Sequence, residues 1–245
     1  MVIPRDYELL DSITGDRSRS EALLERLVKS GWLERVRRGA YVVRSRSASL
    51  RLTAVDLVGE LSPRPHLITA GRALELADLT DQSHRVIVVL TATAVRDWSW
   101  LGEQVAYVRT ARERIWGGEA RGSSHRPPQV ASPERAILDC LAEPRWGVSL
   151  FEVVRALGTC LRRPRFEERL ALAAAHYRNA AVARRIGFLT ETIAGPEAAR
   201  GFLALRGRSN APTLLDPGAG TTGHVVSRWR LFVNVPLALL LEQPS

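Results

Sequence analysis

The basic side chains between residues 17 and 38 have the types and spacing that phosphate binding requires. Residues 17–51 contain ten basic side chains against three glutamates, a net charge of +7, whereas residues 1–16 have a net charge of −3. Guanidinium and ammonium groups bind phosphate oxygens through charge-assisted hydrogen bonds, and such clustering is typical of nucleic-acid binding. The candidate contact residues are Arg17, Arg19, Ser20, Arg26, Lys29, Arg35, Arg37 and Arg38.

A short first helix is predicted before Gly15, because apolar residues recur there at helical spacing. These residues are Tyr7, Leu9, Leu10 and Ile13. The stretch between residues 13 and 20 is too short for the full middle helix of a three-helix core. The middle helix is therefore either reduced to a turn around Asp16–Ser18, or the three-helix core is abbreviated.

The next helix is predicted to begin with Ser20 as its N-cap and to end at Gly31, because serine and glycine favour these two positions. Its apolar stripe consists of Leu23, Leu24, Leu27 and Val28. Arg19, Arg26 and Lys29 lie on the opposite face, where they are free to meet a partner.

A β-hairpin is predicted directly after this helix. Apolar Leu33 and Val36, then Tyr41 and Val43, alternate with other residues around an Arg-Arg-Gly turn, the pattern of two strands and a tight turn. Helix, glycine and basic hairpin occur in the order of a recognition helix and its wing. In a winged helix-turn-helix the wing arginines hold phosphates while the helix reads base edges in the major groove. The same pattern also describes an ordinary solvated surface.

The remaining residues predict a larger second domain. A linker at Ser45–Ser49 separates residues 1–48, the winged helix-turn-helix, from residues 53–245, a mixed α/β domain with a helix-rich second half. Strands that precede a run of helices indicate an α+β fold. The predicted strands are His66–Ile68, Arg85–Leu90, Val105–Val108, Thr213–Leu215 and Val225–Val233. The predicted helices are Thr53–Leu61, Gly71–Ala77, 133–142, 149–158, 165–176, 179–193 and 196–205, with a polar loop at Gly117–Pro128.

Two sequence strings in the helical part, Ser132–Leu141 and Arg184–Leu189, suggest structural roles more than catalytic ones. Ser132 is a good N-cap with proline after it, and Arg135 and Asp139 stand four residues apart, where they can pair along a helix. Candidates for additional phosphate contacts are Arg162, Arg163, Arg184 and Arg185. For Arg184 and Arg185 we favour a solvated or intramolecularly paired face over binding to phosphate or a partner. Gly187 indicates the close approach of a neighbouring element.

Catalytic motifs are largely missing. Lys29 is the only lysine, so the large domain lacks the lysine of a P-loop and of many restriction-type nucleases. The five histidines and two cysteines have no zinc-ligand spacing, and there is no Gly-x-Ser-x-Gly elbow. The string Gly218–Gly223 satisfies a dinucleotide-binding pattern, but strand-like residues follow it, so we interpret it as a flexible hairpin loop. We expect no catalytic residues, metal or cofactor.

The expected compartment is the cytoplasm. No apolar run reaches the length of a membrane span, and the chain begins without the basic and apolar regions of a secretory signal. The run Leu231–Leu241 contains Asn234 and Pro236 and is interpreted as a buried strand and tail. Cys140 and Cys160 are expected to be reduced core residues.

Five strings, in order along the chain, resemble the AbiEi antitoxin family of transcriptional regulators. They are Leu27–Tyr41, Leu67–Leu74 with Leu79–Gln82, Ser132–Leu141, Arg184–Leu189 and Trp229–Asn234. The resemblance implies the antitoxin of a type IV toxin–antitoxin pair, which represses its own operon and counteracts a nucleotidyltransferase-like toxin. It also implies duplex promoter DNA as the partner, bound by a monomer or a homodimer. The shortened region before Ser20 departs from the family pattern.

Two other classes of function remain open from the sequence. One is a stand-alone winged-helix transcription factor whose large domain senses a ligand or mediates dimerisation. The other is a nucleic-acid-processing enzyme that uses aspartates and glutamates of the helical region.

Overall fold

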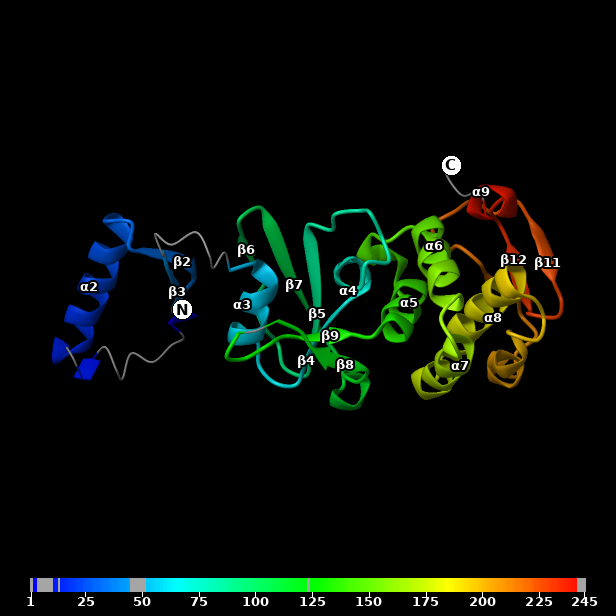
Figure 1. Ribbon diagram of the computed structural model, residues 1–245, viewed down its shortest axis with the longest axis horizontal. Helices are drawn as coiled ribbons and strands as arrows, with labels where there is room; N and C mark the ends of the chain where they lie inside the picture. The colour runs from blue at the N-terminus through cyan, green and yellow to red at the C-terminus, as the bar shows by residue number, and fades with distance from the viewer. Residues whose placement is uncertain (1, 4–10, 13, 45–51, 123, 242–245) are drawn as a thin grey trace. The chain divides into compact units, whose positions relative to one another are not determined.

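The computed structural model describes residues 2–3, 11–12, 14–44, 52–122 and 124–241 (Figure 1). It divides into two compact units. The first comprises Met1–Leu67, Arg85–Ile115 and Ala120–Gln129, and the second comprises Ile68–His84, Trp116–Glu119 and Val130–Ser245. The predicted linker Ser45–Ser49 lies outside the described residues, and the predicted domain division stays a prediction.

Helix α2 (Arg17–Lys29) dominates the N-terminal part of the first unit (Figure 1). Its N-cap is Asp16, whose side chain accepts a hydrogen bond from the Arg19 amide at 2.9 Å. The sequence prediction of Ser20 as N-cap is therefore wrong by one turn. The predicted end is confirmed: Gly31 has a φ of +76°, and the amide of Trp32 bonds the Leu27 carbonyl at 2.9 Å in a Schellman-type cap.

A three-stranded antiparallel sheet follows in the order β1-β3-β2. The strands are β1 (Val2–Ile3), β2 (Leu33–Arg37) and β3 (Ala40–Val43). The predicted hairpin is thus present as β2 and β3. In the three-stranded sheet, β3 is the central strand. Burial on β3 falls on Ala40 and Val42 and not, as the alternation predicted, on Tyr41 and Val43, which stay half-exposed. The register shift between Arg35 and Arg37 buries Val36.

The rest of the first unit combines a helix with parallel strands. Helix α3 (Ala54–Leu61) begins with a capping box, in which Thr53 and Asp56 bond each other's backbone amides. Strand β5 (Val86–Thr91) runs parallel to β7 (Glu103–Arg109), and β6 (Trp98–Trp100) is antiparallel to β7. A short 3₁₀ turn, η1 (Arg112–Arg114), follows β7. The sequence missed β6, which is three residues long.

In the second unit α5 is the central helix of a four-helix bundle. Its helices are α5 (Pro133–Ala142), α6 (Leu150–Leu161), α7 (Phe166–Tyr177) and α8 (Ala180–Ala194). Helix α5 contacts the other three and also α4 (Ala70–Leu76). Strand β4 (His66–Thr69) pairs in parallel with β9 (Gln129–Ala131) at Ile68 and Val130, and β8 (Gly118–Ala120) lies beside β9. The bundle confirms the α+β prediction.

A small sheet in the order β10-β12-β11 lies near the C-terminus. Its strands are β10 (Thr213–Leu214), β11 (His224–Val226) and β12 (Leu231–Val233). The predicted strand Val225–Val233 is thus two antiparallel strands, separated by a turn in which Arg230 has a φ of +49°. The remaining short elements are η2 (Pro144–Trp146), η3 (Arg200–Arg206) and α9 (Leu237–Leu241).

Three predictions in this region are corrected. Residues 196–205 do not form an α-helix, since η3 begins only at Arg200. The C-terminal apolar run is a strand and a short helix, α9, not a strand and tail. The string Gly218–Gly223 is not a hairpin loop, because β10 and β11 do not pair and β12 lies between them. The close approach predicted at Gly187 is confirmed, because a Cβ there would collide with the Trp229 ring.

No helix in the described ranges is long and apolar enough to cross a membrane.

Candidate nucleic-acid interface

A tight turn positions α2. Asp11, Ser12 and Thr14 are helical, and Gly15 (φ +88°) and Asp16 then redirect the chain into α2. The apolar residues proposed for the first helix, Tyr7, Leu9, Leu10 and Ile13, lie outside the described residues. Within residues 14–44 there is no helix between Thr14 and Arg17. Two residues, Gly15 and Asp16, therefore connect the helical Thr14 to α2.

Ser20 holds this turn together and does not lie on the surface. It is fully buried. Its hydroxyl donates to Asp11 Oδ1 at 2.6 Å and lies 2.7 Å from the Thr14 hydroxyl. Since these groups occupy the hydroxyl, Ser20 cannot reach a phosphate and is removed from the candidate contact residues.

The outward face of α2 carries the cations that the sequence predicted. Arg17 forms ion pairs with Asp11 at 3.9 Å and Glu21 at 3.4 Å, and Arg19 pairs with Asp16 at 3.4 Å. Arg26 and Lys29 are exposed, and their side chains form no hydrogen bond or ion pair with any described residue. The second half of the helix therefore presents two cations that are available to a partner.

The β2–β3 hairpin, called the wing, carries three arginines, of which two are exposed and one is hydrogen-bonded within the protein. Arg35 and Arg38 are exposed and, in the described part of the chain, unpaired. Arg37 is half-buried, and its guanidinium donates to the carbonyl oxygen of Leu61 at 2.8 Å. This carbonyl belongs to the last residue of α3, where helical carbonyls lack an intrahelical partner. Arg37 therefore already has a structural partner.

Glu34 of β2 is held by two residues that the sequence did not single out, Trp100 and Arg44. The Trp100 indole donates to Glu34 Oε1 at 3.1 Å, and the Arg44 guanidinium donates to Glu34 Oε2 at 3.1 Å. Glu34 is half-buried and Trp100 is buried. A glutamate inside a basic strand is a weak sequence signal for such an anchor, and nothing in the sequence indicates its tryptophan partner.

Arg184 and Arg185 are not available to phosphate. Arg184 is 3 % exposed, and its acceptors among the described residues are all neutral oxygens of the second unit. These are the carbonyl oxygens of Arg206, Ser209, Ala211 and Arg230 and the Thr213 hydroxyl. Arg185 donates to the carbonyls of Leu141 and Leu214 at 2.7 and 2.9 Å. Burial lowers the pKa of both guanidinium groups.

Arg162 and Arg163, the other two arginines predicted to contact phosphate from the second unit, are exposed, as such a contact requires. Arg162 donates to the Gly158 carbonyl and the Thr159 hydroxyl, both at 3.3 Å, and so caps α6. Arg163 has no side-chain partner among the described residues. Arg163 thus remains a candidate, whereas Arg184 and Arg185 are corrected to structural residues.

The predicted pairing along α5 is confirmed and is buried. Arg135 Nε donates to Asp139 Oδ2 at 2.9 Å, with both side chains at most 4 % exposed. Asp139 also accepts hydrogen bonds from Thr69 at 2.5 Å and Tyr177 at 2.9 Å. The Arg135 guanidinium lies 4.6 Å from the centre of the Trp116 ring. Asp139 thereby joins β4, α5 and α7, which supports an architectural interpretation of this string.

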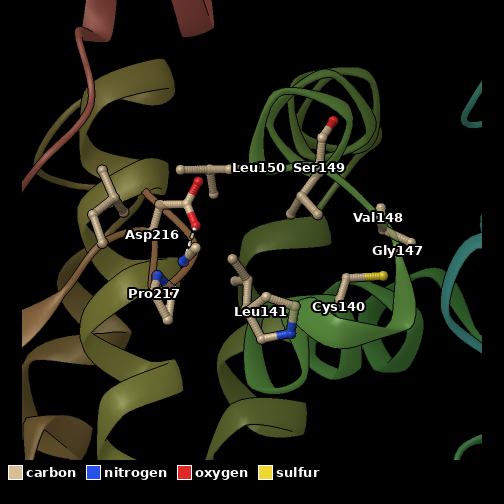
Figure 2. A pocket seen from close by; sticks show the side chains of 12 residues that line it. Cys140, Leu141, Gly147, Val148, Ser149, Leu150, Asp216 and Pro217 are labelled. Carbon is tan, nitrogen blue, oxygen red and sulfur yellow. Dashed lines mark hydrogen bonds between the residues drawn. The ribbon is translucent and has the colours of Figure 1, made fainter. Parts of the chain in front are cut away.

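A pocket of about 320 Å³ opens in the second unit (Figure 2). Its lining is mostly apolar and includes Leu141, Leu150, Val153 and Leu215, and Cys140, Ser149 and Asp216 also line it. Burial raises the pKa of the Cys140 thiol well above its ordinary value. The described residues contain no cluster of histidine, cysteine, aspartate and glutamate suited to a metal ion.

Comparison with known proteins found a family model that matches one segment of the chain and a solved structure with a similar fold. Residues 15–44 match the model of the family described as transcriptional regulator, AbiEi antitoxin, which confirms the resemblance for this segment. The crystal structure of the RV2827C protein from Mycobacterium tuberculosis superposes with a TM-score of 0.69 at 15% identity, over 98% of this chain and 88% of that chain. At this identity the similarity shows the fold alone. No curated protein matches the sequence.

Proposed function

We propose that the protein is a transcriptional regulator that binds duplex DNA through α2 and the β2–β3 wing. The observation that carries this proposal is the set of four exposed, unpaired cations on these elements in the described part of the chain: Arg26, Lys29, Arg35 and Arg38. Arg17 and Arg19 add charge at the start of the helix. The family match over residues 15–44 covers the same elements and supports the same function.

The experiment is a titration of the full-length protein with labelled duplex from upstream of its own gene, followed by fluorescence anisotropy at several salt concentrations. Four phosphate contacts predict a log–log slope of affinity against salt of about −3.6. A shuffled duplex of the same composition measures non-specific binding. A flat salt response, or equal affinity for both duplexes, contradicts the proposal.

We further propose the role of a type IV antitoxin, which represses its own operon and counteracts a nucleotidyltransferase-like toxin. The support is the family description of the matched segment. Co-production with the product of an adjacent nucleotidyltransferase-like gene should restore growth that this product arrests. Growth arrest that persists despite soluble regulator contradicts the antitoxin role and leaves DNA binding untouched.

Ligand sensing by the second unit is a second candidate, and the pocket beside Leu150 and Asp216 favours it (Figure 2). Apolar walls with few polar groups are typical of small-molecule sites. An uncharged fluorescent probe, N-phenyl-1-naphthylamine, should bind the protein, and Leu150→Trp should abolish this binding by filling the pocket. Equal probe fluorescence with both proteins contradicts this candidate.

A further inference from the structure

The outermost line of side chains on α2 has an unusual composition for a helix with a basic surface. At 3.6 residues per turn, Ser18, Ala22, Glu25 and Lys29 fall on one line, directly opposite the buried Ser20 and Leu24. All four are exposed. Two small residues therefore occupy the first half of the line, and a carboxylate occupies its centre.

The cations lie mainly to the sides of this line. Arg19 and Arg26 lie on one flank and Arg17 on the other, by the same helical spacing. A major groove has phosphates along both rims and base edges along its floor. Flanking cations suit the rims, and the small Ser18 and Ala22 let the helix backbone approach the floor.

The Glu25 carboxylate is unpaired among the described residues. It forms no hydrogen bond or ion pair with Lys29, one turn further along, although the spacing would permit one. The other two glutamates of α2 and the β2–β3 hairpin are paired, Glu21 with Arg17 at 3.4 Å and Glu34 with Arg44 at 3.1 Å. A free anion at the centre of a phosphate-binding surface lowers affinity for every duplex unless it accepts a hydrogen bond from a base.

We infer that Glu25 is a specificity-determining residue that accepts a hydrogen bond from the exocyclic amine of a cytosine in the major groove. The inference rests on the proposed DNA-binding function. A carboxylate accepts hydrogen bonds and donates none when ionised, and cytosine N4 presents a donor to the major groove, where aspartate and glutamate accept it. Guanine and thymine present acceptors at their corresponding positions, and adenine places its N7 acceptor beside its N6 donor. Only cytosine therefore offers Glu25 a donor without a neighbouring acceptor.

The test is selection of a preferred duplex from a randomised library by the wild-type protein, followed by competition binding with every single base-pair change of that duplex. We expect the wild-type protein to require C·G at one position, where other base pairs weaken binding about tenfold or more. Glu25→Ala should lose this discrimination and should bind non-specific duplex more tightly, because it removes a negative charge. Glu25→Gln, which can also donate, should shift the preference at that position.

Glu21→Ala is the matched control, because it removes a paired glutamate one turn away. It should keep the wild-type preference for C·G. If Glu25→Ala keeps the wild-type preference at every position, or weakens all duplexes equally as loss of a helix-stabilising charge would, the inference is wrong while the proposed function stands. If the wild-type protein binds no duplex DNA, both are wrong.

Discussion

The Ser20 hydroxyl donates a hydrogen bond to the Asp11 carboxylate at 2.6 Å, across the turn that joins the first helix to α2. This bond spans nine residues and is supplemented by Thr14, whose hydroxyl lies 2.7 Å from that of Ser20. The arrangement explains why a polar residue occupies a buried position of α2. It also fixes the direction in which α2 leaves the turn.

Ser20→Ala should therefore destabilise the protein without removing a DNA contact. The Asp11 carboxylate loses a donor, and leaving a polar group unsatisfied costs about 1–3 kcal/mol. Urea unfolding followed by circular dichroism measures the change in the free energy of unfolding. Ser18→Ala, at an exposed position of the same helix, is the control and should change stability by less than about 0.5 kcal/mol. Equal stability of both variants would show that the turn does not depend on this hydroxyl.

Arg184→Met should destabilise the second unit and leave the salt dependence of DNA binding unchanged. The substitution keeps most of the apolar side chain but removes the donors to four carbonyl oxygens and the Thr213 hydroxyl. Because several part-buried acceptors lose partners at once, we expect a loss of about 3 kcal/mol, measured by thermal and urea unfolding. Arg163→Met, at an exposed and unpaired position, should be close to wild type in stability. A stable Arg184→Met protein with weakened DNA binding would contradict the structural assignment.

The two cysteines should be unreactive in the folded protein. Burial raises the pKa of Cys160 to about 11 and raises that of Cys140 well above its ordinary value. At pH 8 a thiol with a pKa of about 11 is ionised in about one molecule in a thousand, and only the thiolate reacts readily. Ellman's reagent should therefore label neither cysteine at pH 8 until urea is added, when both should react. Rapid labelling of the native protein would place one of them at the surface.

Local signals predicted much of the fold, and long-range contacts account for the errors. The starts of α3 and α5 could be predicted from Thr53 and from Ser132 with Pro133. An N-cap side chain bonds a backbone amide only three residues further along, so its signal is local. The predicted N-cap of α2 is wrong because Ser20, although a residue type that favours N-caps, donates its hydroxyl hydrogen bond to Asp11, nine residues earlier. Adjacent arginines at 184 and 185 look like a basic surface, and only the three-dimensional fold brings carbonyl oxygens around them.

The candidate interface was predicted in outline and revised in detail. Exposure of Arg26, Lys29, Arg35 and Arg38 agrees with the spacing of the helix and hairpin. The partner of Arg37 could not be predicted, because Leu61 lies 24 residues away in another element. The hydrogen bond from Trp100 to Glu34 could not be predicted for the same reason, because the two residues are 66 positions apart. Residue type thus indicated which side chains could bind phosphate, while tertiary contacts decide which of them are available.

Arg38 and Arg37 are adjacent in the wing, and their replacement should affect DNA binding differently. Arg38→Ala removes an exposed, unpaired guanidinium in the described part of the wing. It should weaken binding to all duplexes alike and reduce the log–log salt slope by about one, the effect of losing one phosphate contact. The free energy of unfolding should stay within about 0.5 kcal/mol of wild type, as is usual for surface substitutions.

Arg37→Ala instead removes the donor to the Leu61 carbonyl at the end of α3. Leaving that half-buried acceptor without its partner should lower stability by about 1 kcal/mol, while the salt slope stays close to that of wild type because the guanidinium is engaged within the protein. Anisotropy titrations in a salt series, paired with urea unfolding of each variant, separate the two effects. A reduced salt slope for Arg37→Ala with unchanged stability would mean that Arg37 leaves Leu61 to hold a phosphate when DNA binds.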